Sequence, residues 1–152
     1  MDMDAHDGHA QRPAVDAAPS APLRTWLEFT RGHDPLLLDE LLAADAVFHS
    51  PVVFAPQPGK ALAKAYLAAA AQALGSSRFR VVEQWVGERS AVLEFETELD
   101  GKQVNGVDML WWNEAGKVTR FKVMIRPLSA VQLVQLRVAE ALAAARPALP
   151  NE

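Results

Sequence analysis

The 152-residue chain is long enough for one domain built around one hydrophobic core. Its formal net charge of −4 and pI near 5.6 give no broad positive field for nucleic acid, and no stretch approaches the roughly 18 apolar residues that span a bilayer. The absence of cysteine excludes disulfides, thiolate catalysis and cysteine-based metal sites. We expect a cytoplasmic protein without a metal or a cofactor, and without a nucleic-acid or membrane partner.

The first 21 residues are predicted to form a disordered tail. This segment is rich in alanine and proline, carries His6 and His9 among several aspartates, and cannot bury enough apolar surface to offset its ordering entropy. It lacks the basic start and apolar core of a signal peptide. We interpret it as a solvated tail rather than a metal site. The folded domain is predicted over residues 22–146, and residues 147–152 are predicted to fray.

Helical spacing dominates the first half of the chain. Apolar residues at this spacing predict a helix over 23–31. Asp34-Pro35 combines an N-cap with a first-turn proline, which predicts a second helix over 36–43. A short strand over 46–50 leads into a proline-rich loop. An alanine-rich stretch then predicts a third helix over 60–74.

The hydrophobic pattern changes to a period of two in the second half, and a final helix is predicted over 129–145. Asp100-Gly101 is typical of a tight type I′ hairpin turn. An antiparallel sheet with helices on one face predicts an α+β fold, whose curved sheet leaves room for a cavity beneath the helices. Strands are predicted over 79–86, 93–99, 103–112 and 117–126.

Several residue runs resemble a known superfamily over roughly residues 23–130. They are Gly32-His-Asp34, the run 41–51, Arg78–Val82, the hairpin 107–118 and the closing strand 121–127. These runs are similar to the nuclear transport factor 2-like superfamily and its SnoaL-like members. The resemblance implies a conical, cystatin-like cup with an added C-terminal helix. The superfamily includes isomerases, hydrolases, cyclases and plain binding domains, so the fold alone selects no function.

The hairpin resembles that of ketosteroid isomerase. In that enzyme an aspartic acid in the matching strand stays protonated and donates a hydrogen bond to the substrate oxyanion. The matching residue is Asp108, and strand alternation places it on one face with Leu110 and Trp112, pointing into the cup. Burial among apolar neighbours favours the acid form of a carboxyl, which can stabilise negative charge. Asp108 is therefore the predicted catalytic residue.

The rest of that enzyme's machinery is absent. Ser50 stands where the resemblance places the general base, and a neutral hydroxyl cannot abstract a carbon-bound proton unaided. Trp26 lies in the region of the tyrosine donor, and the single tyrosine, Tyr66, falls on the third predicted helix. The resemblance also excludes the mechanism of the superfamily's epoxide hydrolases. Gly106 and Ile125 occupy the positions at which those enzymes have an arginine and a second carboxylate.

Among the enzymes that the resemblance suggests, a SnoaL-type cyclase requires the fewest catalytic residues. It needs one acid or base in the cup, and Asp108 or His49 could supply it. His49 would face away from the cup if Ser50 faces it, and is then interpreted as a buried, hydrogen-bonded structural histidine. His33 is interpreted as an exposed turn residue, and the glutamates of strand 93–99 as a solvated strand face. Trp85 is placed inside with the other aromatic residues. The predicted ligand-binding residues are Trp26, Ser50, Tyr66, Phe95, Leu110, Trp112, Phe121 and Val123.

Two functional hypotheses follow. In the first, a SnoaL-like domain binds a small, mostly apolar molecule in its cup and acts as an isomerase or cyclase through Asp108. In the second, the cup is a packed core and the protein is a non-catalytic binding or dimerisation module. Apolar Val107, Met109 and Trp111 on the other sheet face indicate a partner surface, so we expect a homodimer.

Overall fold

The computed structural model describes residues 19–76 and 78–145. The predicted frayed end and nearly all of the predicted disordered tail lie outside these residues. Four helices are described: α1 (Ala21–Gly32), α2 (Pro35–Leu41), α3 (Lys60–Leu74) and α4 (Leu128–Ala144). The strands are β1 (Leu42–His49), β2 (Gln57–Pro58), β3 (Arg80–Val86), β4 (Ser90–Leu99), β5 (Lys102–Trp112) and β6 (Val118–Arg126).

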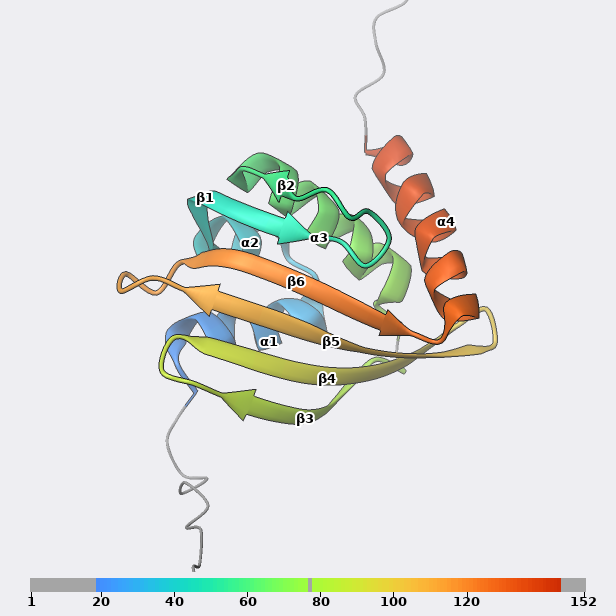
Figure 1. Ribbon diagram of the computed structural model, residues 1–152, viewed down its shortest axis with the longest axis horizontal. Helices are drawn as coiled ribbons and strands as arrows, with labels where there is room; N and C mark the ends of the chain where they lie inside the picture. Colours follow the sequence, from blue (N-terminus) through green and yellow to red (C-terminus); the bar gives the residue numbers. More distant parts are fainter. Residues whose placement is uncertain (1–18, 77, 146–152) are drawn as a thin grey trace, which may run out of the picture.

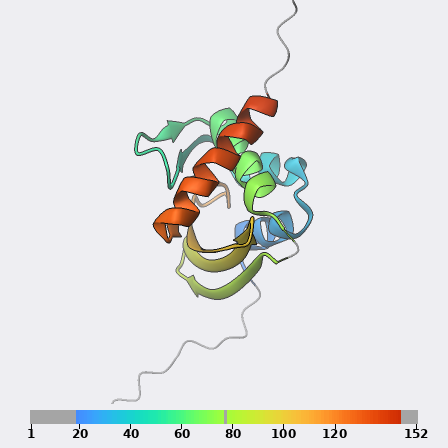
Figure 2. The ribbon, with the colours of Figure 1, turned by 90° about the vertical axis from the view of Figure 1, so that its right-hand side faces the viewer.

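The six strands form one curved sheet in the order β2-β1-β6-β5-β4-β3. Helices α1, α2 and α3 lie behind this sheet in Figure 1, and α4 crosses its end and packs against α3 (Figure 2). The α+β cup with an extra C-terminal helix is confirmed. The sheet is mixed, however, because β1 runs parallel to β6 while the other neighbours are antiparallel.

Local signals set several element ends. The Asp34 carboxylate accepts a hydrogen bond from the Leu36 backbone N–H at 3.0 Å, which confirms the predicted N-cap of α2. That helix ends at Leu41 rather than at residue 43, because the chain turns at once into the buried start of β1. Asp100 and Gly101 both have positive φ, as the predicted type I′ turn requires.

A β-bulge corrects the prediction that Trp85 points inward. Val81 pairs with Phe95, but Glu83 pairs with Glu94, so one extra residue shifts the register of β3. Every residue after the bulge therefore changes face. Trp85 lies on the outer face and is 50% exposed.

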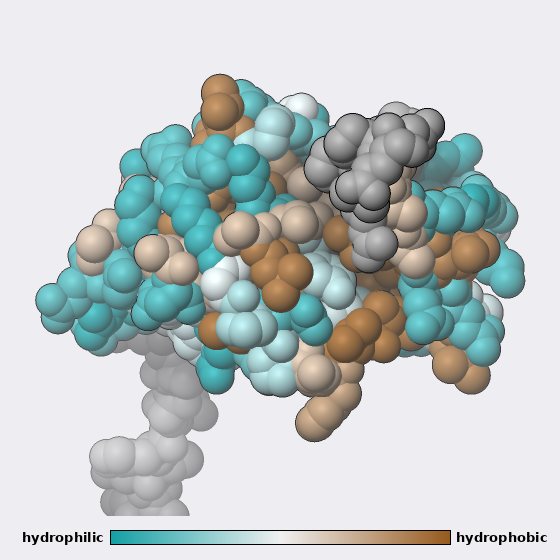
Figure 3. Space-filling model, turned by 90° about the horizontal axis from the view of Figure 1, so that it is seen from above, coloured by the Kyte–Doolittle hydropathy of each residue, from teal (hydrophilic) through white to brown (hydrophobic). Residues whose placement is uncertain are grey.

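The core lies between the concave sheet face and the helices. Its largest fully buried side chains come from α1, α2, α3 and the strands, and include Phe29, Leu38, Leu67, Leu93, Phe95 and Phe121. Seen from above, the surface is mostly hydrophilic, with separate hydrophobic side chains between (Figure 3). No helix among the described residues is long and apolar enough to cross a membrane.

Candidate functional site

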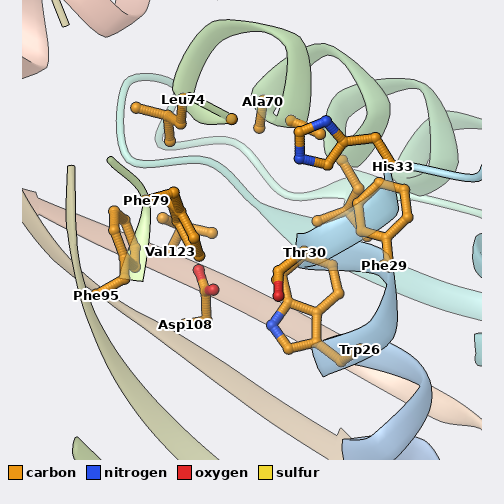
Figure 4. A pocket seen from close by; sticks show the side chains of 13 residues that line it. Trp26, Phe29, Thr30, His33, Ala70, Leu74, Phe79, Phe95, Asp108 and Val123 are labelled. Carbon is orange, nitrogen blue, oxygen red and sulfur yellow. The ribbon is translucent and has the colours of Figure 1, made fainter. Parts of the chain in front are cut away.

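A small cavity lies inside the cup, between α1, the C-terminal part of α3 and the sheet (Figure 4). It encloses about 50 Å³, or about 450 Å³ of atom-free space when its open mouth is included. Small side chains on α3, Ala70 and Ala71, leave this room opposite the aromatic wall. Apolar side chains make up most of the wall, among them Phe29, Leu67, Phe79, Phe95 and Val123.

Asp108 supplies the carboxyl group that lines this cavity. It points inward from the middle of β5, where it pairs with Leu93 and Val123, and it is 6% exposed. Burial removes water from the carboxyl and raises its pKa to about 7. The Trp26 indole N–H faces the carboxyl and opposes this rise. Both protonation states of Asp108 are therefore accessible near neutral pH.

Trp26 presents a second polar group beside that carboxyl. Helix α1 carries it into the core, where its ring meets Phe121 edge-on with centroids 4.5 Å apart. The buried Trp26 Nε1 has no hydrogen-bond partner within the described residues, although it lies close enough to Asp108 to lower the pKa of that carboxyl. An unpaired buried N–H costs about 1–3 kcal/mol. A protonated Asp108 and this N–H are two donors that can serve one acceptor oxygen.

A second, smaller cavity of about 20 Å³ lies under α4. Ser50 and Tyr66 line it together with Val134 and Val138 of α4. Val123 and Leu74 belong to the walls of both cavities. The C-terminal helix, whose role the sequence left open, thus roofs one end of the cup.

The predicted site residues divide into three groups. Trp26, Phe95, Asp108 and Val123 line the first cavity, whereas Ser50 and Tyr66 line only the second. The remaining three are buried in the core and are not among the lining residues of either cavity: Leu110, Trp112 and Phe121.

Ser50 is already engaged locally. Its hydroxyl oxygen accepts a hydrogen bond from the Val52 backbone N–H at 3.1 Å. Such a bond between a serine side chain and the backbone two residues ahead stabilises a turn. Ser50 therefore shapes the loop after β1, and its place beneath α4 separates it from the Asp108 cavity.

His49 faces away from the cup, as expected from strand alternation. It pairs with Lys122 on the outer sheet face, and burial, Lys122 and Arg120 together lower its pKa. The expected buried side-chain hydrogen bond is not found, since His49 is half-buried and makes none among the described residues. It is therefore not placed to act as an acid or base in the cup.

The strand glutamates are paired rather than free to bind metal. Arg78 and Arg80 of the neighbouring segment form ion pairs with Glu98 and Glu96. Asn105 donates a hydrogen bond to Glu94 at 3.0 Å. Within residues 19–76 and 78–145, no three His, Asp or Glu side chains gather in a way that suits a metal ion.

Sequence reasoning missed His33 as a cavity residue. It is exposed, as expected for a turn, but its side chain also lines the mouth of the Asp108 cavity. The sequence places His33 directly after Gly32, at the end of α1. That position identifies a cavity residue only when the structure shows that α1 and α3 end side by side.

The fold and cavity define a cup-shaped α+β domain with one buried acid in an apolar interior. Residues 23–121 match the family model of the SnoaL-like domain, and the chain belongs to this family. Among curated proteins, none matches the sequence.

Solved structures agree with this assignment. A steroid delta-isomerase from Pseudomonas aeruginosa is similar with a TM-score of 0.77 and 29% identity, over 82% of this chain and 90% of that chain. A bacterial protein with a cystatin-like fold from Silicibacter pomeroyi has a TM-score of 0.76 and 24% identity, over 82% and 87% of the two chains. A protein with a ketosteroid isomerase-like fold from Catenulispora acidiphila, in complex with trimethylamine, has a TM-score of 0.57 and 16% identity, over 75% of this chain and 91% of that chain.

Proposed function

We propose that the protein binds a small, mostly apolar molecule in the Asp108 cavity and holds one carbonyl or hydroxyl oxygen of that molecule. The observation that carries this proposal is the Trp26 N–H, which is buried beside the Asp108 carboxyl and has no hydrogen-bond partner among the described residues. Buried polar groups are nearly always paired in native proteins, so an unpaired N–H next to a carboxyl in an apolar cavity suits a ligand oxygen.

The same pair supports acid–base chemistry of the isomerase or cyclase type. With its pKa raised to about 7, Asp108 can donate a hydrogen bond as a neutral acid or accept a proton as a carboxylate. A ligand carbonyl that gains negative charge would be stabilised by Asp108 and Trp26 together. Their confinement in an apolar wall strengthens that interaction, because little water competes for it.

The size of the cavity sets a condition on the ligand. Its enclosed volume of about 50 Å³ is below the roughly 300–1,000 Å³ of most ligand pockets. We expect Phe79 to move when a ligand enters, because its side chain is only partly buried and its ring stacks on Phe95 at 5.3 Å at the cavity edge. The small volume is also the observation that favours the alternative, a non-catalytic module with a packed core.

Ligand binding is tested by thermal shift with bicyclic phenols and ketones, aromatic polyketides and terpenoid epoxides. A compound at 100 times its Kd should stabilise the protein by about 2.7 kcal/mol. Asp108→Leu and Trp26→Phe should each weaken a binding compound about fivefold, because each removes the donor of one hydrogen bond. The exposed Asp45→Asn serves as control. Equal binding by all variants would place the compound outside the cup.

We also propose that the outer sheet face forms a homodimer. Two exposed apolar side chains lie on this face, namely Trp85 of β3 and Met124 of β6. Acidic Glu83 and Glu94 lie toward the β3 edge of this face, whereas basic Arg120 and Lys122 lie on β6. A two-fold axis would place the acidic β3 side of one subunit against the basic β6 strand of the other.

The dimer is tested by sedimentation velocity on charge variants. Lys122→Glu should shift the protein toward monomer, because it sets acidic edges against each other. Adding Glu83→Lys to Lys122→Glu should restore the dimer. Leu36→Glu, which alters an exposed leucine on α2, is the control. A wild-type monomer at 100 μM, or no rescue by the second change, would contradict this interface.

A further inference from the structure

The Asp108 cavity has a titratable side chain at its mouth. His33 and Asp108 line the same cavity, and Figure 4 shows them on opposite sides of it. Between them the wall is apolar, apart from the Trp26 N–H and the Thr30 hydroxyl. Thr30 already donates a hydrogen bond to the Leu27 carbonyl oxygen at 2.7 Å. The His33 imidazole makes no side-chain hydrogen bond to another described residue, which leaves its nitrogens available to a ligand.

Helix capping alone does not explain this histidine. The C-cap of α1 has left-handed backbone geometry, with φ 55° and ψ 29°, a position that favours glycine. His33 occupies that position, and Gly32, the last residue of the helix, lies one residue earlier. Exchanging the two residues would suit the backbone better. A non-glycine residue held in left-handed geometry beside a cavity motivates the hypothesis that its side chain has a function.

The surroundings of His33 hold its ring over the mouth. Its backbone N–H donates to the Phe29 carbonyl oxygen at 2.8 Å, and the two rings pack with centroids 6.0 Å apart. On the other side the ring rests against Gly75, the C-cap of α3. A Cβ at Gly75 would lie 2.0 Å from His33 Cε1, so a side chain there would displace the ring. The ends of α1 and α3 together fix the imidazole.

We propose that His33 is a ligand-binding residue of the cup and that it hydrogen-bonds a second polar group at the outer end of the bound molecule. This inference rests on the proposed binding of the inner oxygen by Asp108. It names the ligand class more narrowly, as a small apolar body with an oxygen at each end. A ligand with only the inner oxygen would bind in the same cavity but gain nothing from His33.

The proposal is tested with three related probes: 2-naphthol, which has one oxygen, and 2,6-dihydroxynaphthalene and 6-hydroxy-2-naphthoate, which have an oxygen at each end. His33→Gly should weaken binding of the two-ended probes about fivefold and leave 2-naphthol within twofold. Asp108→Leu, which removes the polar group at the inner end, should weaken all three. The control is Leu36→Ala, which alters an exposed side chain outside the cavity. Affinities are measured by isothermal titration calorimetry on the full chain.

The melting temperature of His33→Gly separates a ligand role from a structural one. Because glycine suits left-handed geometry, the variant should melt no lower than wild type, and up to a few degrees higher. Equal weakening of one-ended and two-ended probes would overturn the role of His33 while leaving the inner site intact. A lower melting temperature of His33→Gly, without selective weakening of the two-ended probes, would also overturn the role of His33. If no probe binds wild type, both the proposed function and this inference fail, whereas the selective result supports both.

Discussion

Replacing Asp108 with asparagine is expected to stabilise the protein by about 4 kcal/mol at pH 8. The wild-type carboxyl has a pKa of about 7 in the folded protein, against 3.8 for an aspartate exposed to water, because burial disfavours its charge. Asparagine has nearly the same shape and cannot ionise. The gain is a large fraction of the roughly 5–15 kcal/mol that stabilises an ordinary domain.

The sign follows from proton binding in the two states. Between pH 3.8 and about 7 the folded protein keeps a proton on Asp108 that the unfolded chain has lost. The contribution to stability is therefore full below the unfolded pKa and is lost as the pH rises through the folded pKa, at about 1.4 kcal/mol per pH unit. The two proteins should have similar stability near pH 3.5, and Asp108→Asn should be the more stable at pH 8.

Urea unfolding of both proteins between pH 4 and pH 8 measures this difference directly. Asp45→Asn, which alters an exposed aspartate on β1, should not reproduce the pH dependence. A less stable Asp108→Asn at pH 8 would show that the carboxylate has an internal structural partner. The expected result would instead mean that the wild-type protein retains a destabilising group, as active and binding sites often do.

Gly106→Ala is expected to destabilise the protein by about 3 kcal/mol, the upper range for an overpacked core. Gly106 lies on the inner face of β5 directly opposite Phe95. A Cβ there would lie 2.6 Å from the Met124 carbonyl oxygen and 2.6 Å from Phe95 Cζ. Neither a backbone carbonyl nor a buried ring can yield without strain. Moving the ring would also push it toward the Asp108 cavity, so ligand binding should weaken.

A double-mutant cycle identifies the cause of that loss. Phe95→Leu removes part of the clashing ring, so the double variant should lose less stability than the sum of the two single variants. Gly32→Ala is the matched control, because nothing lies within 4 Å of its added Cβ and alanine is the better helix former. It should stabilise slightly. Additive losses in the cycle would show that Phe95 is not the obstacle.

Much of the architecture was predictable because its signals are local. The Asp34 cap, the Asp100-Gly101 turn and the alternation along β4 each depend on residues close together in the chain. The inward direction of Asp108 followed from the same alternation. The fold and the predicted acid of the cavity could therefore be derived from neighbouring residues and a family resemblance.

Periodicity, caps and turns act over a few residues, so they were enough to predict the α+β order and the direction of Asp108, and the family resemblance added the cup. Three other features depended on how distant parts of the chain pack. The bulge in β3 turned Trp85 outward, because a register shift depends on the partner strand. Ser50 came to line the small cavity under α4 rather than the Asp108 cavity. The paired ends of α1 and α3 brought His33 to the cavity mouth, because contacts between distant segments arise only when the chain packs.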